Sequence, residues 1–207
     1  GQKVIVCERG YLGDRFKWTS IGWNGLNGSA NFMNEDVPSD RWDKYWADGM
    51  KDWQDNDGHI VLCGQVKGDA ALDGVDYQRW LDKTASKLHE QYPNNEIRWR
   101  PHPLSNCWRR PPHTTMRGNT TLEDDLKGAK LCVNYNSNSG VVAVYNGIPT
   151  VTFDKGSMVY EVTSHDVSEI VCPDRTYWGH KIAYTQWLPE EIESGESWER
   201  LRRYVAR

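Results

Sequence analysis

The stretch "HIVLCGQVKGDA", from His59 to Ala70, joins a short apolar run to a turn that holds two glycines and one acid. Four apolar residues followed by glycine and polar residues predict a short buried strand. The acid, Asp69, lies directly after Gly68. Two interpretations of Asp69 stay open: it caps the next helix, since Asp is a preferred capping residue, or it is a catalytic carboxylate.

Strands and helices alternate along the chain after this stretch. The helices are expected over 77–91, 121–126 and 139–145, and the strands over 96–100, 131–135 and 150–153. Alternation of this kind predicts βαβ units, and therefore an α/β fold with a Rossmann-type parallel sheet and flanking helices. Ligands of open α/β sheets bind at the carboxyl ends of the strands.

Four functional side chains each follow a predicted strand, and we expect them to share one edge of the sheet. They are Glu8, Asp69, His102 and Ser137. Glu8 is a candidate general acid or base, and the alternative is an exposed carboxylate paired with Arg9.

His102 lies between two prolines in "RPHP", residues 100–103. Proline restricts its own backbone and that of the residue before it, so the segment is stiff. A fixed histidine suits the binding of a phosphate, and Arg98 and Arg100 nearby favour an anion. The alternative is a structural turn with an incidental histidine.

The segment "NSNSG", residues 136–140, follows a predicted strand and begins a predicted helix. Exposed backbone N–H groups and hydroxyls at such a position favour an anion. The alternative is a simple serine cap. The sequence lacks GxxxxGK[ST], and no GxGxxG follows a strand, which argues against a Walker loop and a dinucleotide fingerprint.

The composition argues against several classes of protein. The formal net charge is −4 over 207 residues, which argues against DNA binding through bulk positive charge. The five cysteines form no CxxC, which favours reduced thiols in a cytoplasmic protein and argues against a zinc site. No apolar run approaches the ~18 residues of a membrane span.

Four stretches, in chain order, resemble segments of the bacterial capsule-polysaccharide glycosyltransferases, the family of KpsC-type and KpsS-type Kdo transferases. "ERGYL" at 8–12 is similar to the family's E-D/R-G-F-L-R, and "QVKGDA" at 65–70 to QVxxDxS. "RPHP" at 100–103 resembles RxHP, and "SNSGVVA" at 137–143 with "GIP" at 147–149 resembles S-x-S/T-G-x-E-A with G-x-P. The resemblance covers residues 5 to 155, roughly.

This resemblance implies a GT-B-like fold of two Rossmann-like halves around a cleft, and sugar transfer from a nucleotide donor, typically CMP-β-Kdo. Carried over by position, Asp69 attacks the anomeric carbon and Glu8 is the acid/base for the acceptor hydroxyl. The implied donor-binding residues are Gln65, Arg100, His102, Asn136, Ser137, Asn138, Ser139 and Gly140.

The sequence also departs from the family. Val142 stands where the family has Glu, which leaves the donor open, and Ala71 replaces a Ser. Because 207 residues are few for two full halves, we expect a compact, phage-type form with a reduced first half. The expected division is a reduced acceptor-side segment at 1–58 and a Rossmann-like nucleotide-sugar-binding domain with C-terminal helices at 59–207.

The sequence therefore predicts a retaining, metal-independent glycosyltransferase that uses a nucleotide sugar, CMP-Kdo-like or UDP-linked, as co-substrate and needs no cofactor. The expected acceptor is a hydroxyl, and its carrier, a glycan or modified DNA, stays open. Two alternatives stay open: a phage-type transferase that glycosylates a hydroxymethylpyrimidine of DNA, and a non-catalytic nucleotide- or sugar-binding module. The sequence does not fix the oligomeric state.

Overall fold

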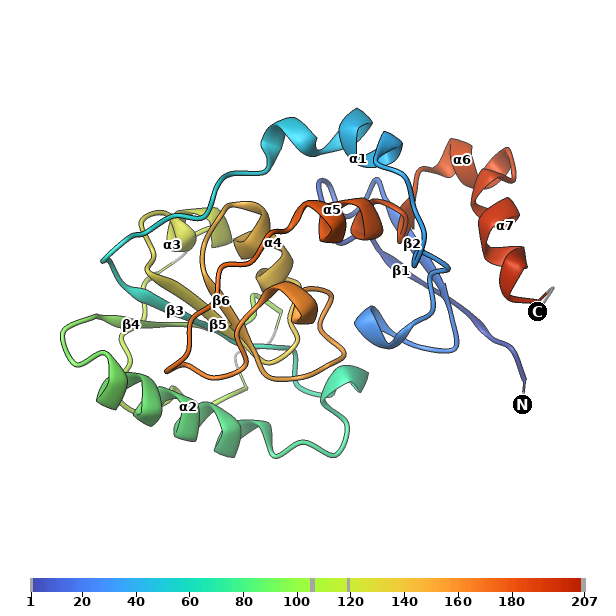
Figure 1. Cartoon of the computed structure of the whole chain (residues 1–207). Coiled ribbons are helices and arrows are strands. Elements are labelled where there is room, and N and C mark those ends of the chain that lie inside the picture. Colours follow the sequence, from blue (N-terminus) through green and yellow to red (C-terminus); the bar gives the residue numbers. More distant parts are fainter. Residues whose placement is uncertain (1, 105–106, 119, 206–207) are drawn as a thin grey trace. The chain divides into compact units, whose positions relative to one another are not determined.

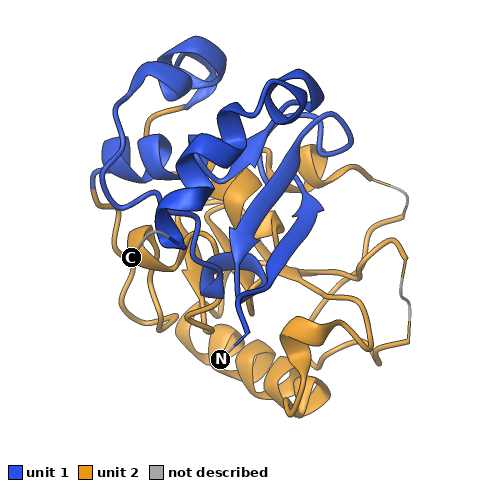
Figure 2. Cartoon of the chain, turned by 90° about the vertical axis from the view of Figure 1, so that its right-hand side faces the viewer, with its two compact units in different colours: residues 1–50, 174–207 blue, residues 51–173 orange. Residues whose placement is uncertain are grey.

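The structure is a computed structural model, and it describes residues 2–104, 107–118 and 120–205. The chain divides into two compact units (Figure 2). Unit 1 is Gly1–Met50 with Asp174–Arg207, and unit 2 is Lys51–Pro173. Across the described ranges, no helix combines the length and the apolar character that crossing a membrane requires.

The centre of unit 2 is a four-stranded parallel sheet in the order β4-β3-β5-β6 (Figure 1). Its strands are β3 (Ile60–Cys63), β4 (Ile97–Arg100), β5 (Leu131–Asn134) and β6 (Thr150–Thr152). Ile60 lies opposite Ile97 on one side and Leu131 on the other. The predicted α/β fold with a parallel sheet is therefore confirmed.

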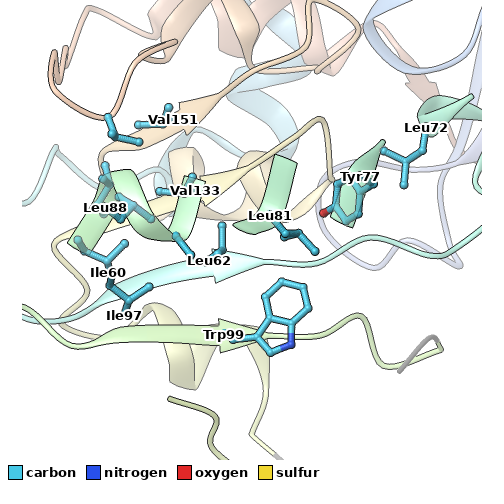
Figure 3. Close-up of a cluster of buried hydrophobic side chains, with 13 residues drawn as sticks. Ile60, Leu62, Leu72, Tyr77, Leu81, Leu88, Ile97, Trp99, Val133 and Val151 are labelled. Atoms are coloured by element: carbon cyan, nitrogen blue, oxygen red, sulfur yellow. The ribbon is translucent and has the colours of Figure 1, made fainter. Parts of the chain in front are cut away.

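Helices cover both faces of this sheet (Figure 1). They are α2 (Tyr77–Gln91) on one face, and α3 (Leu122–Leu126) and α4 (Ser139–Tyr145) on the other. Because side chains alternate along a strand, Leu62 packs with Leu81 and Leu88 of α2 (Figure 3). Its neighbour Cys63 packs instead with the cluster that holds Leu126 of α3.

Unit 1 is built on a three-stranded antiparallel sheet in the order β1-β2-β7. Its strands are β1 (Ile5–Arg9), β2 (Thr19–Trp23) and β7 (Gln186–Trp187). Its helices are α1 (Asp40–Tyr45), α5 (Thr176–Ala183), α6 (Pro189–Glu193) and α7 (Glu196–Leu201). This sheet has fewer strands than the parallel sheet of unit 2, and the reduced acceptor-side first half stays a prediction.

A buried arginine ties the helices of unit 1 to its sheet. Arg41 of α1 is 4% exposed, and its Nη1 donates to Glu191 Oε1 of α6 at 2.6 Å. Its Nη2 donates to the carbonyl of Gln186 at 2.9 Å, and its guanidinium lies 4.2 Å from the Trp187 ring centroid. The buried charge is therefore paired, hydrogen-bonded and stacked, as burial of an ion requires.

Two sequence expectations need correction. Residues 174–207 group with unit 1 and not with the Rossmann-like domain, because β7 pairs with β2 through Thr19–Trp187 and Ser20–Gln186. Glu8 does not lie on the sheet edge of Asp69, because β1 belongs to the antiparallel sheet of unit 1. A strand rich in apolar residues does not reveal by itself which sheet it joins.

Candidate functional site

Polar side chains follow every strand of the parallel sheet at its carboxyl edge. Gln65 follows β3, His102 follows β4, Asn136 follows β5 and Asp154 follows β6. Because all four strands run in the same direction, these residues gather at one edge, where open α/β sheets bind ligands. The expectation of a shared edge is thus confirmed for the segments after β3, β4 and β5.

Each of the two glycines after β3 is required for a different physical reason. A Cβ on Gly64 would lie 2.6 Å from the Trp99 ring, so no larger residue fits there. Gly68 has φ +85°, a left-handed conformation that glycine adopts without a steric penalty. The backbone thereby turns sharply enough to bring Asp69 back towards the strand end.

Asp69 is half-buried, and both of its carboxylate oxygens are engaged. Oδ1 accepts a hydrogen bond from the backbone N–H of Ala71 at 3.0 Å, so Asp69 caps the 3₁₀ turn η3 (Ala70–Leu72). Oδ2 accepts from Gln65 Nε2 at 3.4 Å. The capping interpretation is therefore correct for one oxygen, and the catalytic role stays a prediction.

Two buried amides join the ends of β3, β5 and β6. Gln65 Nε2 donates to Asn136 Oδ1 at 2.5 Å. Asn136 Nδ2 in turn donates to the carbonyl of Ala71 at 3.0 Å and to Asp154 Oδ1 at 3.3 Å. Asp154 also accepts from the N–H of Gly156 at 2.7 Å. The amides therefore connect two carboxylates, Asp69 and Asp154.

A pocket of about 330 Å³ opens beside Asp69. Its lining consists of Gly68, Asp69, Ala70, Leu72, Asp73, Val75, Tyr77 and Trp108. The half-buried ring of Trp108 packs on the ring of Tyr77, which is 1% exposed, at 4.9 Å between centroids. The two rings form an aromatic wall, of which Trp108 is the exposed part. A carboxylate beside aromatic rings suits a sugar, whose C–H faces pack on rings and whose hydroxyls donate to oxygen.

The aromatic wall is fixed to the end of β3. The Tyr77 hydroxyl donates to the carbonyl of Cys63 at 3.3 Å, and Trp108 Nε1 donates to the carbonyl of Gln65 at 2.7 Å. Burial raises the pKa of Tyr77 well above its ordinary value of 10.0, so the phenol keeps its proton and remains a donor. The wall and Asp69 are thus both positioned by the same strand end.

A second pocket, of about 290 Å³, lies at the end of β4 and includes His102 and the exposed Arg117. The Nδ1 atom of His102 accepts from the backbone N–H of Leu104 at 3.2 Å. The neutral ring therefore carries its proton on Nε2. A ring N–H and a guanidinium in one pocket suit an anion.

Arg100 also lines this pocket, but its charge is largely compensated within the fold. Its Nη1 forms an ion pair with Asp125 and donates to the carbonyl of Thr120 at 3.0 Å. Asp125, in α3, is 4% exposed. Arg100 therefore connects β4 to α3, and its predicted contact with a donor stays a prediction.

The segment from Asn136 to Gly140 turns from β5 into α4. Ser137 Oγ accepts from the N–H of Ser139 at 3.3 Å, and Ser139 Oγ is buried. A Cβ on Gly140 would lie 2.9 Å from Asn134 Nδ2, so this glycine is required for packing. The predicted anion-binding role of Ser137, Asn138, Ser139 and Gly140 stays a prediction.

Glu8 lies in unit 1 and is half-buried. Its Oε2 accepts from the Tyr11 hydroxyl at 2.9 Å and from the N–H of Asn27 at 3.0 Å. Burial is the main reason that the pKa of Tyr11 is raised above its ordinary value of 10.0, so Tyr11 remains a donor to Glu8. The acid/base role of Glu8 stays a prediction.

Sequence reasoning missed three residues of this edge. Asp154 follows the predicted strand at 150–153, so the rule that found Asp69 could have found it. Tyr77 and Trp108 are the wall of the Asp69 pocket. Trp108 lies in a segment without a periodic pattern, and no sequence signal marks it. Within the described part of the chain, no cluster of three or more His, Cys, Asp or Glu could hold a metal.

Comparisons with known proteins support the fold. Neither a family model nor a curated protein sequence matches this chain. The structure is similar to a KpsC β-Kdo 2,7 transferase from Thermosulfurimonas dismutans, with a TM-score of 0.60 and 16% identity over 96% of this chain and 78% of that chain. It is also similar to a KpsC β-Kdo 2,4 transferase from the same organism, with a TM-score of 0.61 and 12% identity over 93% and 79%.

At these identities the likeness is one of fold. The GT-B-like α/β fold that the sequence predicts is thereby confirmed.

Proposed function

We propose that the protein is a glycosyltransferase that moves a sugar from a nucleotide-sugar donor to a hydroxyl of a glycan acceptor. One observation carries the proposal: Asp69 is fixed through both oxygens at the carboxyl edge of the sheet and faces a pocket with an aromatic wall. The similarity of fold to two Kdo transferases supports the same class of reaction.

The chemistry needs a carboxylate at the anomeric carbon. Glycosyl transfer passes through an oxocarbenium-like state, which a nearby carboxylate stabilises or attacks. In the retaining course, an Asp69 oxygen bonds to the anomeric carbon while the bond to the phosphate oxygen breaks and the nucleotide leaves. The acceptor oxygen then displaces Asp69 and gives its proton to a general base.

The leaving nucleotide needs groups that bind negative charge. The pocket at the end of β4 is lined by the imidazole of His102 and by the Arg117 guanidinium. Hydrogen-bond donors and a guanidinium charge stabilise a leaving phosphate. We assign the nucleotide to this pocket and to the segment 137–140, and the sugar to the pocket beside Asp69. The donor is a CMP-Kdo-like or UDP-linked sugar, and no metal takes part.

Nucleotide binding to wild type and His102→Ala tests the assignment. Calorimetry with CMP, UMP and GDP should give one preferred nucleotide, whose affinity falls about tenfold in His102→Ala because a hydrogen bond to a charged group is lost. His113→Ala is a matched control, because His113 is exposed and stacks on His89 outside both pockets. Binding of none of the three nucleotides would contradict the proposal.

A further inference from the structure

A ring of hydrogen bonds encloses the carboxylate of Asp69. Its Oδ1 accepts from Ala71 N at 3.0 Å, and the carbonyl of Ala71 accepts from Asn136 Nδ2, also at 3.0 Å. Asn136 Oδ1 then accepts from Gln65 Nε2 at 2.5 Å, and Gln65 Nε2 also donates to Asp69 Oδ2 at 3.4 Å. Both groups that hold Asp69 are therefore themselves held by Asn136.

The chemistry of the ring fixes the orientation of its amides. A reversed Gln65 would place Oε1 against two acceptors, Asp69 Oδ2 and Asn136 Oδ1. A reversed Asn136 would place Oδ1 against the Ala71 carbonyl and the Asp154 carboxylate. Acceptors that face each other without a hydrogen are repulsive. Position 136 therefore requires both a donor and an acceptor, and position 65 requires a donor, since the buried Oε1 of Gln65 has no hydrogen-bond partner among the described residues.

These amides have little capacity to donate hydrogen bonds to a ligand. Gln65 is 4% exposed and Asn136 is 6% exposed. The two hydrogens of Gln65 Nε2 are directed to Asn136 and Asp69, and those of Asn136 Nδ2 to Ala71 and Asp154. A buried amide whose N–H groups are all engaged within the protein can influence the reaction through the residues that it positions.

On the basis of the proposed function, we propose that Gln65 and Asn136 are positioning residues. They hold Asp69 at the anomeric carbon and do not bind the nucleotide sugar. Asn136 fixes the turn that Asp69 caps, while Gln65 fixes the other carboxylate oxygen. Loss of either amide should therefore slow the chemical step and leave donor binding nearly unchanged, since misplacement of a reacting group lowers the rate.

The test is steady-state turnover of UDP-glucose and CMP-Kdo by wild type, Gln65→Glu and Asn136→Asp. Both variants should lose about 10- to 100-fold in kcat, with a KM that stays within about threefold. Gln65→Glu should also recover as the pH falls from about 8 to about 5, because a protonated acid donates a hydrogen bond again. A merely structural role would not produce this change in the pH profile.

A matched control lies at the opposite edge of the sheet. Asn95 Nδ2 donates to the carbonyl of Gly58 at 2.6 Å, and Asn95→Asp removes the same kind of donor there. This control should keep the kcat of wild type. Hydrogen exchange of the Ala71 amide, followed by NMR, tests the ring of hydrogen bonds directly. The Ala71 N–H should exchange about tenfold faster in Asn136→Asp than in wild type, and the exchange of the α2 amides should be unchanged.

The outcomes separate this inference from the proposed function. Absence of wild-type turnover with both donors would overturn both. Wild-type turnover with an unchanged kcat in Gln65→Glu and Asn136→Asp would overturn the positioning role and leave the transferase standing. Unchanged exchange at Ala71 in Asn136→Asp would also overturn the positioning role, whatever the turnover.

Discussion

The indole N–H of Trp108 donates to the backbone carbonyl of Gln65 at 2.7 Å. Gln65 thereby holds the aromatic wall through its main chain and the Asp69 carboxylate through its side chain. One residue at the end of β3 sets the distance between the surface on which a sugar would stack and the group that would react with it.

Substitution of Trp108 should weaken donor binding in two steps. Trp108→Phe keeps a ring but loses the hydrogen bond to Gln65, so we expect KM to rise about threefold to tenfold. Trp108→Ala also removes the stacking surface, and we expect a rise of about 10- to 100-fold. Steady-state kinetics with the preferred donor check both values. An equal KM in all three proteins would show that the sugar does not contact this wall.

Unit 1 should depend on the ion pair between Arg41 and Glu191. The two side chains are 5% and 9% exposed. Glu191→Ala leaves the buried Arg41 with only the longer contact to Glu196 Oε1, at 3.6 Å from Nη1, so the free energy of unfolding should fall by up to about 3–5 kcal/mol. Urea denaturation measures this change. Glu190→Ala, at the exposed neighbouring position, should change stability by less than about 0.5 kcal/mol, and an equal effect in both variants would contradict the assignment.

The same pair should make stability depend on pH. Burial by itself raises the pKa of Glu191, but hydrogen bonds from Arg41 and from the Leu188 N–H, with the charge of Arg41, lower it below its ordinary value of 4.5. A carboxyl with a lowered pKa in the folded state contributes stability above its unfolded pKa, and loses it as the pH falls through the folded pKa.

Wild type should therefore lose stability as the pH falls below about 4.5, and Glu191→Gln should lose less over the same range. Urea denaturation of both proteins at a series of pH values gives the comparison. A difference in stability between the two proteins that stays constant from neutral to acid pH would show that Glu191 does not contribute to the acid sensitivity.

Turnover should not depend on a divalent metal, since His102, Arg117 and backbone N–H groups are proposed to neutralise the phosphate. Excess EDTA should leave kcat/KM within about twofold of its value without the chelator, because metal-ion stabilisation is worth several kcal/mol where it is used. A loss of activity that Mg²⁺ or Mn²⁺ restores would show that a metal ion takes part in the reaction.

The parallel sheet could be predicted from the sequence because its strands are short apolar runs between amphipathic helices. Asp69 could be singled out because glycine and an acid follow such a run. The sheet to which β1 belongs could not be predicted. Its partner β2 is close in sequence, but β7, which completes that sheet, begins at Gln186, far along the chain.

The roles within the site were less predictable than its location. "QVKGDA" marks a strand end with an acid, but nothing in it shows that Gln65 bonds to Asn136, which lies 71 residues further on. Trp108 reaches the Asp69 pocket from a segment without periodicity. Contacts of this kind arise from the packing of distant segments, and a local pattern does not encode them.

The measurement that tests the central claim most directly is the turnover of a nucleotide sugar by wild type, Asp69→Asn and Asp73→Asn. Asp73 lines the same pocket but is exposed, so it is the matched control. We predict that wild type releases the nucleotide, that Asp69→Asn loses at least about 1000-fold in kcat, and that Asp73→Asn stays within about fivefold. Wild-type kcat in Asp69→Asn would contradict the assignment of Asp69 as the reacting carboxylate.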